Sequence, residues 1–262
     1  MESTQQVNRT ETEVLPFVIA DNFMADELAR QTDEFRGNVP FEHIVIDNFL
    51  PEAHAAFLAK DFPRPDHPVW LDWRKRSPFQ WGKQGAGDCS KFSTLEPLFR
   101  LAMNEFNAAP FLKYLGRLTG VERLLPDPYF SGGGMHQIVS GGILDIHTDF
   151  NLYHRLGIYR RLNVLIYLTE EWREGYGGCL ELWDKAAKAG GRCVKSIPPL
   201  YNRAAIFKTD KKSFHGHPIE WTAPSDLTRR SIALYYYTAD REVGGEYNEK
   251  TDFQNVVSKP LP

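Results

Sequence analysis

The stretch GGILDIHTDFNLYH, residues 141–154, brings two histidines and two aspartates together directly after a short apolar run. The apolar residues are of the strand-forming type, and the glycine pair before them is typical of a turn or bend. Because alternate residues of a strand point to the same face, we expect His147 and Asp149 to project together. The stretch predicts two metal ligands on one strand face, with an ordinary ion pair on a surface strand as the alternative.

The chain around this stretch is rich in short apolar runs separated by Gly, Pro and Asn. The runs after Tyr129 include RLNVLIYLT (161–169), GGCLELWD (177–184), RAAIFKT (203–209) and RSIALYYYT (230–238). Several short strands at nearly regular spacing indicate a sandwich or barrel rather than a parallel sheet. We therefore predict a mainly β, α+β fold with a jelly-roll core over about 125–240.

The segments before and after this core are predicted to support it. Helices are expected from Pro51 and over about 94–106 and 108–118, with Ser93-x-x-Glu96 as a capping box. The full division is an N-terminal arm over 1–38, a single domain over 39–240 with helical support at about 50–120, a loop flanking a cleft at 75–90, and a C-terminal tail over 241–262.

Composition excludes several classes of protein. The 262 residues contain 31 Lys plus Arg and 34 Asp plus Glu, with no long basic run, so neither nucleic acid nor an anionic membrane is expected as a partner. The three cysteines are scattered, which disfavours a disulfide framework and fits a reducing compartment. There is no apolar run of membrane-spanning length and no signal-peptide core near the start, so we predict a cytoplasmic protein.

A third metal ligand is expected from a strand distant in sequence. The segment KTDKKSFHGHP (208–218) carries His215 and His217 just after an apolar strand, and the residues alone do not choose between them. Two histidines and one carboxylate with open positions are the arrangement expected for non-haem Fe(II).

The chain also resembles a known family, the Fe(II)/2-oxoglutarate-dependent dioxygenases, in particular their prolyl-4-hydroxylase-like branch. The segments that carry the resemblance are HTDFN (147–151), RLNVLIYLTEEW (161–172), YGGCLELW (176–183), FKTDKKSFHGHP (207–218) and RRSIALYYYT (229–238). The resemblance implies a double-stranded β-helix (jelly-roll or cupin-like) core, with N-terminal helices packed on one sheet.

The resemblance also implies roles for individual residues. His147, Asp149 and His215 would bind the iron, and His215 is preferred because its distance from Phe207 matches that in the hypoxia-type prolyl hydroxylases. His217 would then be a cleft residue.

A second group of residues would bind the cosubstrate. Arg229 would anchor the distal carboxylate of 2-oxoglutarate, with Ser231 completing an R-x-S pattern, because a guanidinium binds a carboxylate through two parallel hydrogen bonds. Tyr167 would donate a hydrogen bond to the cosubstrate, and Asn163 is a further candidate on the same strand face. The expected substrate-cleft residues are His136, Gln137, Asn151 and His217.

The implied reaction consumes 2-oxoglutarate and dioxygen, releases succinate and carbon dioxide, and hydroxylates an unactivated C–H bond, with ascorbate as a supporting reductant. Asp149 favours hydroxylation, because halogenating relatives replace this carboxylate with a small residue. A small-molecule substrate is expected, such as an amino acid, a natural product or a sugar intermediate. The alternatives are a peptidyl, prolyl-type hydroxylase, a non-catalytic jelly-roll binding module and a zinc hydrolase. The oligomeric state is not predicted.

Overall fold

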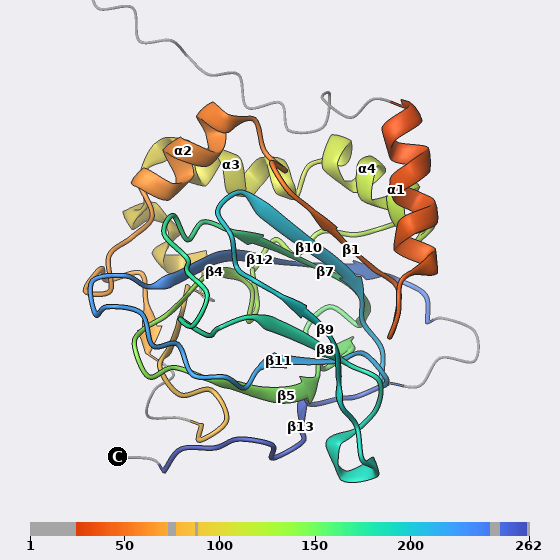
Figure 1. The fold of residues 1–262 in the computed structure, drawn as a ribbon. Helices are drawn as coiled ribbons and strands as arrows, with labels where there is room; N and C mark the ends of the chain where they lie inside the picture. The colour runs from red at the N-terminus through yellow and green to blue at the C-terminus, as the bar shows by residue number, and fades with distance from the viewer. Residues whose placement is uncertain (1–24, 73–76, 87–88, 242–246, 261–262) are drawn as a thin grey trace, which may run out of the picture.

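The computed structural model describes residues 25–72, 77–86, 89–241 and 247–260. Two antiparallel sheets face each other, and the helices lie together on the outer side of the larger sheet (Figure 1). This arrangement confirms the predicted mainly β, jelly-roll fold with helices packed on one sheet. The first 24 residues of the predicted N-terminal arm lie outside the described part of the chain.

The strands of each sheet come from distant parts of the sequence. The larger sheet has the order β1 (His43–Ile46), β10 (Arg203–Lys208), β7 (Ile158–Tyr167), β12 (Arg229–Thr238), β4 (Gly134–Ile138), β3 (Lys83–Gly85) and β2 (Leu71–Asp72), with β6 (Leu152–Tyr153) paired to β7. The smaller sheet has the order β13 (Asp252–Phe253), β5 (Leu144–Thr148), β11 (Phe214–His217), β8 (Leu180–Trp183) and β9 (Cys193–Ile197).

The helices form close to the predicted positions. They are α1 (Ala25–Gly37), α2 (Glu52–Lys60), α3 (Pro97–Phe106) and α4 (Ala109–Thr119), with short 3₁₀ helices at Cys89–Thr94 and Ala187–Ala189. The predicted capping box is wrong: Glu96 precedes α3 without a side-chain cap, and Pro97 occupies the first turn. Proline fits there because the first N–H groups of a helix have no partner within it.

Two apolar clusters hold the layers together. The larger one joins the helices to the larger sheet, as Phe99 and Leu115 pack with Val164 and Ile232. A smaller one fills part of the space between the two sheets and includes Tyr167, Leu182 and Phe207. Burying these side chains removes apolar surface from water, the main favourable term in folding. The rest of the space between the sheets is a cavity lined by polar side chains from both.

The segment after Asp240, predicted as an irregular tail, contributes a strand to the smaller sheet. Its β13 pairs with β5, and the buried carboxylate of Asp145 accepts hydrogen bonds at 2.7–2.9 Å from the backbone N–H groups of Asn255, Val256 and Val257. These bonds fix the C-terminal segment against the strand that carries His147.

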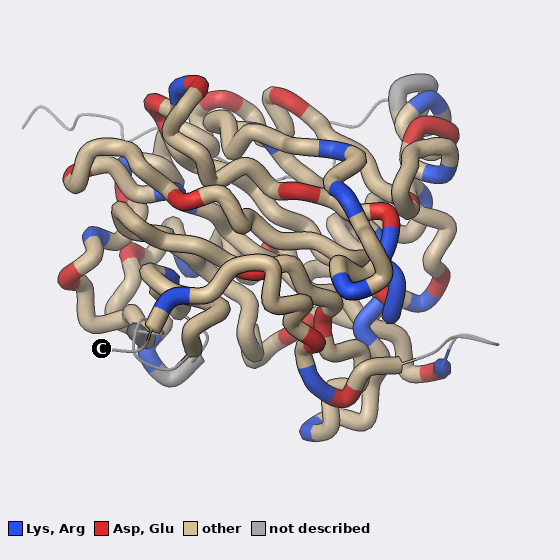
Figure 2. The backbone as a smooth tube through the Cα atoms, turned by 60° about the horizontal axis from the view of Figure 1, so that its bottom comes forward, with Lys and Arg blue, Asp and Glu red and all other residues tan. Residues whose placement is uncertain are grey.

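Charged residues lie mainly on the helices and on the loops that join the strands, whereas the strands between them carry few (Figure 2). None of the helices in the described part of the chain has the length and apolar character needed to cross a membrane. Cys179 and Cys193 are free thiols, and the Cys89 side chain lies outside the described residues.

Candidate metal centre and cosubstrate site

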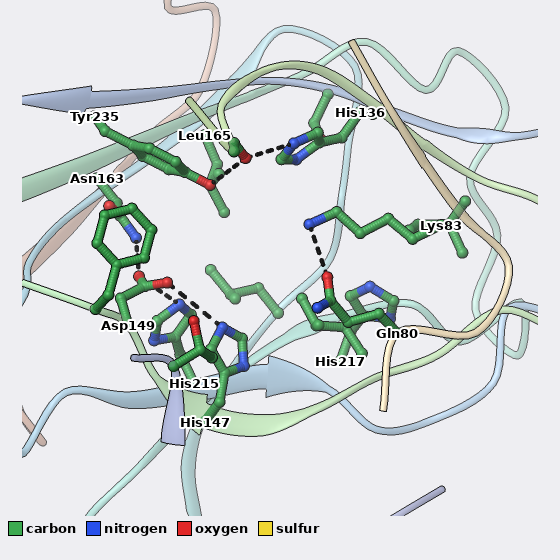
Figure 3. A pocket seen from close by; sticks show the side chains of 18 of the residues that line it. Gln80, Lys83, His136, His147, Asp149, Asn163, Leu165, His215, His217 and Tyr235 are labelled. Atoms are coloured by element: carbon green, nitrogen blue, oxygen red, sulfur yellow. Dashed lines mark hydrogen bonds and ion pairs between the residues drawn. The ribbon is translucent and has the colours of Figure 1, made fainter. Parts of the chain in front are cut away.

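His147, Asp149 and His215 lie together in the cavity between the sheets (Figure 3). His147 on β5 is the direct cross-strand partner of His215 on β11, so the two rings lie side by side with centroids 4.5 Å apart. The Nε2 atoms of His147 and His215 are 3.7 Å and 3.4 Å from the carboxylate oxygens of Asp149. All three candidate ligand atoms lie within 4.8 Å of one another, close enough to bind one ion.

The structure separates His215 from His217, which the residues alone left open. Gly216 lies so close to β5 that an added Cβ would be 2.6 Å from the carbonyl oxygen of Asp145. The β11–β5 register then shifts, and His217 pairs with Leu144 instead of joining the triad. His215 therefore completes the cluster, while His217 lines another part of the same cavity.

The two histidines of the triad are prepared for metal binding. Their Nδ1 atoms lie 2.8 Å and 2.9 Å from the carbonyl oxygens of Asp145 and Ser213, which accept only, so Nδ1 carries the proton and Nε2 is a free lone pair. Burial lowers the pKa of His147 to about 3, with the neighbouring His215 adding to the effect, and burial also lowers the pKa of His215. Both rings are therefore neutral ligands at physiological pH.

Asp149 is held by two buried partners. Asn163 Nδ2 donates to Asp149 Oδ2 at 2.9 Å, and Arg160 Nη2 forms an ion pair with the same oxygen at 2.9 Å, without a well-aligned N–H. Arg160 Nε also donates to Asn163 Oδ1 at 2.8 Å. Burial alone would raise the pKa of Asp149, but the charge of Arg160, the two imidazoles and the Asn163 hydrogen bond lower it below its usual range.

Arg160 was missed in the sequence, and Asn163 has a different partner from the one expected. Asn163 was assigned to the cosubstrate, but its side chain bridges Arg160 and Asp149. The alternation of a strand predicts that one of the adjacent arginines 160 and 161 points inward, and this signal could have identified Arg160.

Arg229 is buried in the same cavity, at the start of β12. Its Nε donates to the Gly178 carbonyl oxygen at 2.6 Å, and its Nη2 lies 3.4 Å from the hydroxyl of Tyr167. Its Nη1 has no hydrogen bond within the described part of the chain. An added Cβ on Gly178 would be 2.8 Å from Trp221 Cε3 and 3.0 Å from Arg229 Cδ, so this glycine leaves room for both side chains. Ser231, two residues further along β12, also lines the cavity.

Of three other residues predicted to line the substrate cleft, His136, Gln137 and Asn151, one lines the cavity. His136 lines the cavity, with Nε2 3.0 Å from the Gly132 carbonyl oxygen. Gln137 does not, because neighbouring strand residues point to opposite faces; its amide bonds to Gln84 and Thr228 instead. Asn151 is buried outside the cavity, where it accepts a hydrogen bond from the backbone N–H of Asn248.

The cavity has a volume of about 200 Å³. Sequence analysis predicted a cleft-flanking loop over 75–90, and this stretch supplies two lining side chains, Gln80 and Lys83, the second from strand β3. Thr251 and Phe253 line the cavity from the C-terminal segment. Two neutral imidazoles, one carboxylate and a nearby arginine fit a non-haem Fe(II) site with a dicarboxylate cosubstrate.

The fold is that of a double-stranded β-helix, and the triad within it is a candidate metal centre. The sequence model of the 2OG-Fe(II) oxygenase superfamily matches residues 133–237, a range that contains the triad and Arg229. Over these residues the chain is similar to the superfamily, and the match supports an enzyme that depends on Fe(II), 2-oxoglutarate and dioxygen. No curated protein matches the chain in sequence.

Solved structures with the same fold contain different kinds of bound molecule. A prolyl hydroxylase from Trichoplax adhaerens, in complex with a hypoxia-inducible-factor peptide fragment, is 16% identical over 82% of this chain and 94% of that chain, with a TM-score of 0.53. HygX from Streptomyces hygroscopicus, with nickel, 2-oxoglutarate and hygromycin B bound, is 12% identical over 90% and 98%, with a TM-score of 0.52. The epimerase SnoN, in complex with Fe³⁺, alpha-ketoglutarate and nogalamycin RO, is 14% identical over 90% and 96%, with a TM-score of 0.55. These similarities confirm the fold.

Proposed function

We propose that the protein binds Fe(II) through His147, Asp149 and His215, binds 2-oxoglutarate through Arg229, and hydroxylates a C–H bond of a small molecule. The observation that carries this proposal is the shared cavity: the triad has two free imidazole lone pairs and an ionised carboxylate, and Arg229 leaves Nη1 for a ligand. Succinate and carbon dioxide are the products of the cosubstrate.

The protein side chains in this reaction bind and orient. The carbonyl groups of Asp145 and Ser213 fix the two imidazole rings, and Arg160 and Asn163 hold the carboxylate of Asp149 ionised. The iron, when bound, supplies the oxidation by dioxygen that no side chain can perform.

Arg229 sets the direction of the cosubstrate. A guanidinium fixes both the position and the orientation of a carboxylate, and the contact with the Tyr167 hydroxyl holds the arginine in place. Ser231 is positioned to donate a further hydrogen bond within the cavity.

A cavity of about 200 Å³ between two sheets supports a small molecule rather than a folded partner. Fold alone does not choose, because the similar structures include a prolyl hydroxylase with a peptide and an enzyme with hygromycin B bound. Peptidyl hydroxylation is the second candidate, and comparing small molecules with short peptides as triggers of succinate release distinguishes the two.

The proposal extends to the division of the chain and its location. We place the catalytic domain over residues 39–240, with the C-terminal segment fixed against it through β13. The cytoplasmic location and the absence of a nucleic-acid or membrane partner stay predictions, which cell fractionation and binding assays check.

In the first experiment, Fe(II) and then 2-oxoglutarate are added anaerobically to the metal-free protein. The weak visible charge-transfer band of the chelate is then measured by absorption spectroscopy. We expect the band in the wild type, a large loss of 2-oxoglutarate affinity in Arg229→Ala, and retained iron binding in that variant. Absence of the band in folded, iron-loaded protein would contradict the proposal and favour a binding module.

A matched pair of variants tests the third ligand. His215→Ala should lose iron binding, whereas His217→Ala should keep it, because only His215 lies within reach of the other two ligand atoms. The opposite result would show that the ligand assignment is wrong while leaving the class of enzyme intact.

A further inference from the structure

The charges that line the cavity are out of balance. The lining contains three cationic side chains, Lys83, Arg160 and Arg229, and one carboxylate, Asp149. Bound Fe(II) and 2-oxoglutarate carry charges of 2+ and 2−, which cancel, so the excess of two positive charges on the lining remains. Arg160 is paired with Asp149, and in the proposed function Arg229 is paired with the distal carboxylate of the cosubstrate. Lys83 has no anionic partner in this scheme.

Lys83 is built into the sheet that forms one wall of the cavity. It stands on β3 opposite Ile138 of β4, which in turn stands opposite Arg229 of β12. Its ammonium group points into the cavity, across from Asp149 (Figure 3). Strands lie about 4.8 Å apart, so the backbones of Lys83 and Arg229 are about 10 Å apart. The two cationic side chains therefore enter the same cavity from backbones two strands apart.

The contacts of Lys83 are few and weak. Its Nζ donates to Gln80 Oε1 at 3.3 Å, and no carboxylate of the described residues forms an ion pair with it. Burial lowers the pKa of Lys83 to about 8, against a smaller opposing effect of Asp149, so the group still carries most of its charge at pH 7. A partly buried cation with only an amide partner is costly unless a ligand supplies the counter-charge.

His217 provides a second, independent indication of a ligand. The residue is 2% exposed and lines the same cavity, yet neither ring nitrogen has a hydrogen-bond partner among the described residues. Buried polar atoms without partners are rare in folded proteins, and a ligand that binds them is one explanation. The ring shares this cavity with Lys83 and Arg229.

We infer that Lys83, with His217 and Gln80, binds an anionic group of the substrate, a carboxylate or a phosphate. The ammonium supplies charge, and the imidazole and the amide each supply an N–H donor. This inference rests on the proposed function and narrows it to acidic small molecules. It also gives a binding role to Lys83, His217 and Gln80, which belong neither to the triad nor to the cosubstrate site.

The test uses protein loaded with Zn(II), which is redox-inert, and saturated with 2-oxoglutarate. Inorganic phosphate is titrated by calorimetry into the wild type, Lys83→Met, Lys83→Arg and the control Lys60→Met, an exposed lysine on α2. We expect phosphate to bind at least about tenfold more weakly to Lys83→Met, to recover in part in Lys83→Arg, and to be unchanged in Lys60→Met. Equal binding to the wild type and Lys83→Met overturns the inference.

Two further measurements distinguish this inference from a role of Lys83 in cosubstrate binding and from failure of the proposed function. If Lys83→Met weakens 2-oxoglutarate binding as much as Arg229→Ala does, Lys83 belongs to the cosubstrate site and the inference is wrong. If the Fe(II)–2-oxoglutarate band never forms in the wild type, the proposed function fails instead.

The second arm uses iron-loaded enzyme and pairs of small molecules that differ only in charge, each carboxylate with its primary amide and each phosphate ester with its alcohol. In the wild type, the acidic member of a pair should trigger succinate release more strongly than the neutral member. The Lys83→Met variant should lose this preference. The triggering class shows whether a carboxylate or a phosphate is bound. Equal responses to charged and neutral members in the wild type contradict the inference.

Discussion

Replacing Arg160 with methionine tests the electrostatic design of the metal centre. The Arg160 side chain is 1% exposed and its guanidinium lies 2.9 Å from the carboxylate of Asp149. Removing one partner of a buried ion pair leaves an uncompensated charge and costs about 3–5 kcal/mol. Asn163 still donates to the carboxylate, so we expect the lower end, about 3 kcal/mol. For a domain of this size that loss lowers the Tm by about 6–12 °C.

Metal should recover much of this loss, since a bound cation replaces the missing charge beside Asp149. Each 1.4 kcal/mol recovered requires about tenfold tighter metal binding by the variant, by thermodynamic linkage. The assay is urea unfolding of Arg160→Met with and without saturating Zn(II), together with direct metal titration. The two measurements must agree.

The matched control is Arg161→Met, the next residue on β7, whose side chain is partly exposed and hydrogen-bonds Thr238. It should cost less than about 1 kcal/mol, with no change in metal affinity. The reasoning is refuted if Arg160→Met loses less than about 1 kcal/mol, or if its loss is the same with and without metal.

Two other substitutions follow from the same cavity. Gly178→Ala should raise the Kd for 2-oxoglutarate at least about tenfold, because the new Cβ would press on Trp221 and on Arg229. Gly175→Ala, also at positive φ but with nothing within 4 Å, should leave this Kd unchanged in the chelate-band titration. Lys83→Met should stabilise the metal-free protein: the fall in the pKa of Lys83 from 10.5 to about 8 corresponds to about 3 kcal/mol, and contact with the open cavity reduces this to about 1–2 kcal/mol. The pKa of Lys83 is lower in the folded state than in the unfolded state, so the gain in stability over wild type is full below about pH 8 and vanishes above 10.5. Thermal unfolding across that pH range measures this gain, with Lys60→Met as the control. Destabilisation of the protein by Lys83→Met would contradict the prediction.

The residues alone were enough to predict the fold class and two of the three candidate metal ligands. Alternation along a strand is a local property, so HTD could be recognised as two ligands on one face without any knowledge of the partner strands. The same holds for the arginine and serine of the R-x-S pattern on β12, which both line the cavity.

Tertiary structure decided what depends on contacts between distant segments. The choice of His215 over His217 follows from the register of β11 on β5 and from the room left by Gly216. The residues by themselves left both histidines open, and His215 was preferred only through the spacing from Phe207 that the family resemblance implies.

The same limit applies to the charged partners in the cavity. Arg160 is 11 residues from Asp149, and Lys83 lies in a segment that was predicted to be a loop. The local sequence around these two residues does not predict that Arg160 pairs with a carboxylate and that Lys83 does not. Pairing between β3 and β4 brings Lys83 to the cavity wall, and pairing of β13 with β5 brings Phe253 there. The burial of a side chain and the net charge around it depend on residues from distant segments, so both are fixed only when the two sheets assemble.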